Sequence, residues 1–194
     1  MFMKTEVTNQ IFEELTKTHW GIIPASISVI MLNQDLSSNG VWLIFWATLM
    51  ASYDVAVRRI PNSLTAMTAI FGLIFSLIQG GMSGFVVSIS SGLLGFGIMA
   101  VLFFLNVLGA GDVKAVASLA VFLSPIQVLY LILFTTISGG ILAIISLIMA
   151  KRVNELSLLA ASVKNWRAVG VGIKLPYALA ILGACLWLVL KTGL

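Results

Sequence analysis

The chain has 194 residues, of which 60% are hydrophobic and only 9% are charged, and its mean hydropathy is +1.10. A soluble domain carries about 25% charged residues, so this composition excludes a water-soluble globule and predicts an all-α, polytopic membrane protein. The formal net charge is +4, but the basic residues lie between apolar runs, which argues for topology signals in a lipid bilayer and against nucleic-acid binding.

Residues 1–40 precede the first long apolar run and hold four of the seven acidic residues. We interpret them as an N-terminal arm, in which the apolar but short segment 21–32 lies at the membrane interface. Residues 41–194 then form the membrane-embedded domain. If 21–32 crosses the bilayer instead, the N-terminus moves inside and the remaining topology is unchanged. The charges of the first residues argue against a cleavable signal peptide.

Six apolar segments follow the arm. Five have roughly the 17–25 residues that a helix needs to cross a bilayer. In chain order these five are 41–57, 63–79, 84–108, 126–150 and 174–191. The sixth, 113–123, covers only roughly half the hydrocarbon thickness and is separated from the next segment by Ser124-Pro125. The sequence therefore predicts about six transmembrane helices, the fourth of them short.

Basic residues give the direction of these helices. With the N-terminus outside, the inner loops hold eight basic residues and the outer segments hold three, in agreement with the positive-inside rule. The eight inner residues are Arg58, Arg59, Lys114, Lys151, Arg152, Lys164, Arg167 and Lys174. Residues 151–173 form the longest inner loop.

The single cysteine, Cys185, lies inside an apolar run and excludes an internal disulfide. One histidine and one cysteine also exclude a structural zinc site of the usual kind. We interpret Cys185 as apolar filling and expect neither a metal nor another cofactor.

Two acidic residues lie where acids are costly. Asp54 ends the first predicted span and Asp112 opens the fourth, and an ionisable residue in such a position is a functional candidate by default. The second and third spans form one hairpin, which brings the chain back to the same side. Both carboxylates should therefore reach the cytoplasmic face at similar depth.

The neighbours of these acids have suitable chemistry. Arg58 follows Asp54 by one turn, and Ile60-Pro61-Asn62 ends one helix and starts the next. Gly109 and Gly111 permit close backbone approach, and Lys114 follows two residues after Asp112.

Two adjacent carboxylates share one proton, which supplies a general base for water and a general acid for the leaving amide. This is the chemistry of an aspartic peptidase. A structural interpretation of each acid remains open, because Asp54 alone could be a partner for Arg58. Asp112 alone could cap the short fourth helix.

The residues Tyr53-Asp54 and Ile60-Pro61-Asn62, followed by Gly109-Ala110-Gly111-Asp112 and Lys114, resemble the type IV prepilin peptidases, and most of all the short TadV/CpaA kind that serves Flp pili. A third, weaker match is the element 175–180, Leu-Pro-Tyr-Ala-Leu-Ala, in which relatives often have glycine at position 178.

The resemblance implies an endopeptidase that removes the leader of prepilins and pseudopilins after a glycine, at the cytoplasmic face of the bacterial inner membrane. It implies Asp54 and Asp112 as the catalytic pair. The implied supporting residues are Gly109, Gly111, Lys114, Arg58, Pro61 and Asn62. Partners would be the prepilin, the lipid bilayer and the pilus assembly machinery. N-methylation of the new pilin terminus is not expected, because the chain lacks the length and the cysteines of the larger relatives.

Two rival interpretations stay open. One is a sibling enzyme, either an archaeal preflagellin peptidase or an intramembrane protease of the presenilin kind, although the latter usually has more spans and a Pro-Ala-Leu element. The other is a cation-coupled transporter that uses the acid pair. It would need polar residues deep in several spans, and this sequence has few.

Overall fold

The computed structural model describes residues 37–105, 108–149 and 177–194, with side chains of the second range described up to residue 142. The interfacial segment predicted at 21–32 and the predicted inner loop 151–173 lie outside the described residues. Within them the chain is entirely helical, which confirms the predicted fold class.

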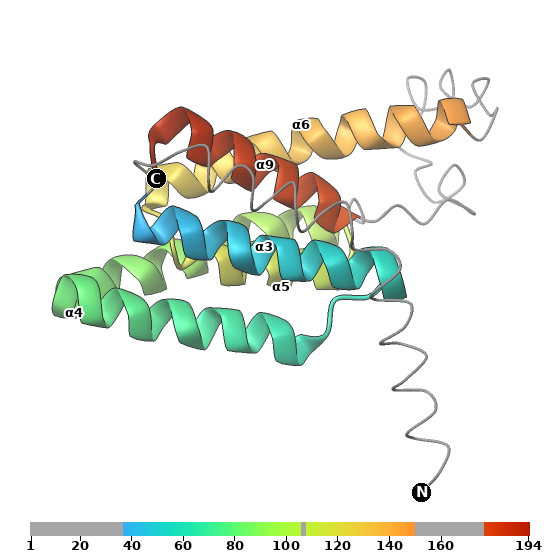
Figure 1. Cartoon of the computed structure of the whole chain (residues 1–194). Helices are drawn as coiled ribbons and strands as arrows, with labels where there is room; N and C mark the ends of the chain where they lie inside the picture. The colour runs from blue at the N-terminus through green and yellow to red at the C-terminus, as the bar shows by residue number, and fades with distance from the viewer. Residues whose placement is uncertain (1–36, 106–107, 150–176) are drawn as a thin grey trace, which may run out of the picture.

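The described chain forms α3 (Ser38–Val57), α4 (Asn62–Phe104), α5 (Ala110–Ala120), α6 (Pro125–Met149) and α9 (Tyr177–Thr192), arranged as a bundle (Figure 1). Of these, α3, α4 and α6 are long and apolar enough to cross a membrane, whereas α9 is a shorter apolar helix. The predicted spans 41–57 and 126–150 correspond to α3 and α6. Two further predicted spans fall along the 43 residues of α4: the span 63–79 lies wholly within this helix, whereas 84–108 extends beyond its end at Phe104.

Helix α4 is folded back on itself at Gly81. This residue has φ 59° and ψ −150°, a conformation that glycine adopts without strain. The hydroxyls of Ser76 and Ser88 form a hydrogen bond, although 12 residues of straight helix would separate them by about 18 Å. The first arm (residues 62–80) and the second arm (82–104) are therefore antiparallel, as the predicted hairpin required.

The short predicted fourth span is α5. It has 11 residues and a length of about 16 Å, roughly half the hydrocarbon thickness. It begins at Ala110 rather than at the predicted residue 113, because Gly109 accepts the first backbone hydrogen bonds, from Asp112 and Val113. It ends at Ala120, and α6 then starts at Pro125, the break that the sequence indicated.

Helix α5 packs against both arms of α4. Its positions Val113, Ala115, Val116 and Leu119 are at most 4% exposed, and small residues of α4 let the helices approach closely. Across the bundle, α9 packs between α3 and α6. Cys185 of α9 is fully buried in this apolar core, which fits its interpretation as filling.

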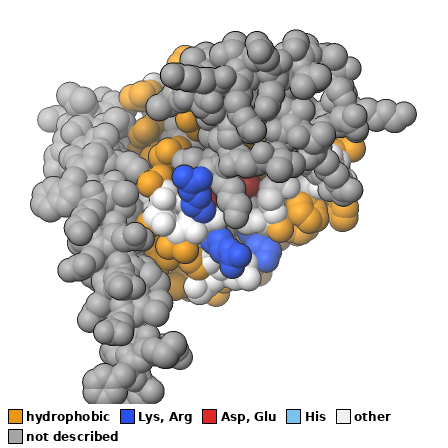
Figure 2. Space-filling view, turned by 90° about the vertical axis from the view of Figure 1, so that its right-hand side faces the viewer, with side chains coloured by type: hydrophobic (Ala, Val, Ile, Leu, Met, Phe, Trp, Pro, Cys, Tyr) orange, Lys and Arg blue, Asp and Glu red, His pale blue; other side chains and the backbone are white. Residues whose placement is uncertain are grey.

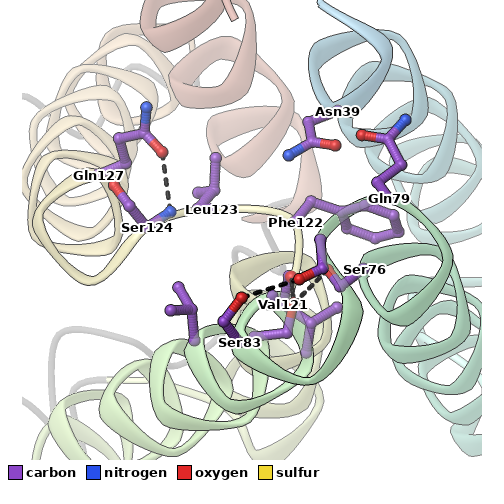
Figure 3. Close-up of a pocket in the computed structure, with 13 residues that line it drawn as sticks. Asn39, Ser76, Gln79, Ser83, Val121, Phe122, Leu123, Ser124 and Gln127 are labelled. Atoms are coloured by element: carbon purple, nitrogen blue, oxygen red, sulfur yellow. Dashed lines mark hydrogen bonds between the residues drawn. The ribbon is translucent and has the colours of Figure 1, made fainter.

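A polar cavity of about 460 Å³ lies at the tip of the α4 hairpin, beside the start of α3 and the turn from α5 to α6. Asn39, Gln79, Ser83 and Gln127 are among the residues that line it (Figure 3). The hydroxyl of Ser88 donates to the carbonyl of Val121 here. Backbone groups outside regular helix need hydrogen-bond partners near a membrane. The polar side chains of this cavity supply such partners at the two chain reversals of this end.

We expect Gly95→Leu to lower the free energy of unfolding by about 1–3 kcal/mol, the usual cost of overpacking. A Cβ at Gly95 would lie 3.0 Å from the Cβ of Ala120 and 3.4 Å from Cγ1 of Val128. Unfolding in detergent, followed by circular dichroism, measures the change. Gly97→Leu is the matched control in the same arm, because a Cβ there meets nothing within 4 Å. Equal destabilisation by both variants would contradict the packing described above.

Candidate active site

The charged side chains of the described residues gather at one end of the bundle. Asp54, Arg58, Arg59, Asp112 and Lys114 line one cavity of about 410 Å³. Figure 2, which views the molecule from this end, shows basic side chains beside a recessed acidic one, with apolar side chains around them. The remaining charged residue of the described ranges, Lys191, lies in the last turn of α9 at the opposite end.

The structure brings the two sequence-predicted acids together. Asp54 comes from the end of α3 and Asp112 from the first turn of α5, and both line the cavity. They are close enough for their charges to interact. Since the chain between them forms the two arms of α4, the hairpin returns Asp112 to the level of Asp54.

Asp54 is 7% exposed and is fixed from two sides. Its Oδ2 accepts a hydrogen bond of 3.0 Å from the backbone N–H of Ala178. Its own carbonyl accepts from the N–H of Arg58 at 2.9 Å. The sequence placed Arg58 one turn after Asp54 on the same helical face, but α3 ends at Val57, as the predicted span 41–57 does, and Arg58 is its C-cap.

Arg58 adopts the left-handed conformation, with φ 54° and ψ 34°. A residue with a Cβ is strained there by roughly 1–3 kcal/mol, and helices more often place glycine or asparagine at this position. This conformation ends α3 one turn after Asp54 and keeps Arg58 at the cavity, where its charge interacts with the Asp54 carboxylate.

Asp112 occupies the third position of α5 and binds back to its start. Its Oδ2 accepts from the N–H of Gly109 at 3.2 Å. A Cβ at Gly109 would lie 3.1 Å from the same oxygen, so a larger residue would press on the carboxylate. The sequence suggested Asp112 as the N-cap of this helix, but the N-cap is Gly109, and Asp112 binds back to it from the third helical position while it also lines the cavity.

The remaining predicted supporting residues divide into two groups. Lys114 donates from Nζ to Oδ1 of Asn62 at 2.9 Å, which ties α5 to the start of α4 at the cavity wall. Gly111 lines the cavity beside them. Pro61 is not among the lining residues. It is the N-cap of α4 and fixes where that helix begins.

Two residues at the start of α9 were not among the predicted site residues. Ala178 supplies the amide to Asp54, and Tyr177 lines the same cavity as Asp112. One signal in the sequence could have found them, because the element 175–180 is the third match to the prepilin peptidases. The long separation of 124 residues from Asp54 hid the contact.

Helix α6 packs against the Tyr177 ring at Gly139. A Cβ at Gly139 would lie 2.7 Å from Cε2 of the Tyr177 ring and 3.4 Å from its hydroxyl oxygen. The ring therefore needs a glycine at this position. Within the residues that the structure describes, no group of three His, Cys, Asp or Glu side chains that could hold a metal ion is found.

The comparisons with known proteins give one finding. The type IV leader peptidase family matches residues 41–144, more than half of the chain. Both acids lie within the matched residues, whereas α9 follows them. The comparisons with curated proteins and with solved structures found no match. Members of this family are aspartic peptidases that cleave the leader of prepilins.

Gly139→Leu should lower kcat/KM for prepilin cleavage about ten-fold or more, because a larger side chain pushes the Tyr177 ring toward the acid pair and small displacements at a reacting centre are costly. Cleavage in detergent, read by gel mobility, measures the effect. Gly140→Leu is the neighbouring control, since a Cβ there meets nothing within 4 Å. An unchanged rate in a folded Gly139→Leu enzyme would show that the ring does not support the site.

Proposed function

We propose a mechanism on the premise that the chain belongs to the type IV leader peptidase family, which makes it a multi-pass membrane protein and an aspartic prepilin peptidase. In this mechanism Asp54 and Asp112 are the catalytic residues. The observation that carries the proposal is that the two acids come from two different helices and line one cavity.

Two carboxylates that interact within one cavity ionise one after the other, so over a range of pH the pair holds a single proton. The ionised carboxylate takes a proton from a water molecule, and the resulting hydroxide oxygen bonds to the carbonyl carbon of the scissile peptide. The protonated carboxyl then gives its proton to the leaving nitrogen as the carbon–nitrogen bond breaks. The pair ends with one proton again, which allows a further cycle.

Backbone amides prepare the pair for this chemistry. The amide of Ala178 holds Oδ2 of Asp54 and that of Gly109 holds Oδ2 of Asp112. Each acid is therefore oriented through one oxygen by a rigid group. In this proposal Gly111 leaves space in the cavity because it has no side chain, and Arg58, Asn62 and Lys114 act as supporting residues. Pro61 contributes by starting α4 beside the site.

We further propose that the cavity faces the cytoplasm. Three of the four basic residues of the described ranges, Arg58, Arg59 and Lys114, line it, and basic residues are enriched on the cytoplasmic side. A prepilin has an apolar helix in the bilayer and a basic leader inside, so its scissile bond reaches the membrane at this edge. The short TadV/CpaA-like pattern favours a Flp-type prepilin in the bacterial inner membrane.

Membership of a peptidase family leaves the sequence-based transporter interpretation without support. We propose a Flp-type prepilin as the substrate, and other prepilins are the alternative substrates to compare. Co-expression with candidate prepilins, followed by the mobility shift that accompanies leader removal, is the direct assay.

Asp54→Asn and Asp112→Asn should each lower the cleavage rate by about 10²–10⁴-fold, because each removes one member of a general acid–base pair. Co-expression with a Flp-type prepilin and a mobility-shift gel measures this. Glu155→Gln, which removes a carboxylate from the segment predicted as the inner loop, should leave cleavage unchanged. Cleavage that persists in the double Asn variant would refute the proposed pair.

The rate of cleavage should depend on pH with a single maximum. At low pH both carboxyls are protonated and no base remains, and at high pH both are ionised and no acid remains. Initial rates on purified enzyme in detergent, measured between about pH 4 and pH 9, test this shape. Asp112→Asn should abolish the maximum along with the activity, and a pH-independent rate in the unaltered enzyme would contradict a shared proton.

A further inference from the structure

A second, mostly apolar cavity lies next to the acid pair. It has a volume of about 470 Å³ and lies between the two arms of α4, with α5 beneath it. Its lining residues recur at helical spacing on all three segments. They are Asn62, Thr65, Ala66, Ala69 and Leu73 on the first arm, Ile89, Gly92, Leu93 and Phe96 on the second, Lys114, Ala117 and Ser118 on α5, and Val121 just after α5. We call this cavity the hairpin groove.

The groove exists because α5 separates the arms. At the tip they touch through Ser76 and Ser88. Away from the tip, the side chain of Val121, the residue that follows α5, lies against both Gly72 and Gly92, so that a Cβ on either glycine would meet it. The two arms therefore cannot close on each other, and the end of the groove away from the tip stays open.

The groove leads directly to the acid pair. Asn62 and Lys114 line both the hairpin groove and the cavity that holds Asp54 and Asp112. These two residues are also hydrogen-bonded to each other at 2.9 Å. A chain that leaves the groove at this end thus enters the cavity of the proposed catalytic pair.

Size and chemistry indicate what the groove accepts. From Asn62 to Leu73 it is about 16 Å long, which corresponds to about three turns of an α-helix. The alanines of the first arm and of α5 are small, and small residues let helices approach closely in a membrane. The rim is apolar and open, since Leu93 is 66% and Phe96 49% exposed. A polar or charged occupant has no partners along most of this length.

We propose that the hairpin groove binds the apolar membrane helix of the prepilin, with the N-terminal end of that helix at Asn62 and Lys114. The peptide bond that precedes the helix then enters the cavity of Asp54 and Asp112, while the leader lies on the cytoplasmic side. The inference rests on the proposed function, because that function defines the substrate. It adds a substrate-binding site built from the α4 hairpin and α5.

Site-specific photo-crosslinking tests this placement. A benzophenone amino acid is placed at Leu93 of the Asp54→Asn, Asp112→Asn enzyme, which is co-expressed with the Flp-type prepilin. Met67 is the control position, since it is 60% exposed on the first arm and does not line the groove. Lipid is available to both positions, so that only a prepilin bound in the groove distinguishes them. We therefore expect about ten-fold more crosslinked prepilin from Leu93 than from Met67.

Equal crosslinking from both positions, or only lipid adducts at Leu93 while the unaltered enzyme cleaves the prepilin, would overturn the groove proposal. Crosslinking confined to Leu93 while the double Asn enzyme still cleaves would support the groove and refute the acid pair. The two proposals therefore fail in different ways.

Groove filling gives an independent measurement. Ala69→Trp should raise KM for the full prepilin about ten-fold, because the added ring occupies the space of the substrate helix. Met67→Trp should change it less than about two-fold. A short peptide with the leader and scissile bond but no apolar helix should be cut equally by Ala69→Trp and the unaltered enzyme. An equal loss on both substrates would mean that the substitution distorts the acid pair instead.

Discussion

The contact on which the site depends is the hydrogen bond between the N–H of Ala178 and the Asp54 carboxylate. A carboxylate buried in an apolar bundle is costly unless a donor satisfies it, and here the donor comes from a helix 124 residues away in the chain. The adjacent residue, Tyr177, reaches the surroundings of Asp112. The start of α9 thus adjoins both acids. The site is therefore complete only when α9 has packed into the bundle.

The half-length α5 is the second structural requirement. A full span at this position would carry its N-terminus across the bundle, whereas 11 residues place Asp112 beside Asp54 and leave the tip of the hairpin to the polar cavity. Its apolar face packs on both arms of α4 and keeps them apart. The same helix therefore positions one acid, separates the arms and forms the floor of the groove beside them.

Glycines at helix contacts make this arrangement possible, and each has a specific neighbour. Gly95 admits Ala120, Gly109 admits the Asp112 carboxylate, and Gly139 admits the Tyr177 ring. Other glycines in the same helices, such as Gly97 and Gly140, face open space. In the sequence the two kinds are indistinguishable, since what differs is the side chain that another helix brings to the position.

The sequence by itself determined the all-helical class, the short fourth helix, the two acids and their common end, because hydropathy, chain length and rare charges are local properties. It also indicated the breaks at Pro61 and Pro125, since proline removes a backbone donor. Only the tertiary structure decided that Arg58 ends α3, that Ala178 and Tyr177 adjoin the acids, and that a groove leads to them. Those features depend on which helices meet, and packing between segments far apart in the chain leaves no periodic pattern in the sequence of either one.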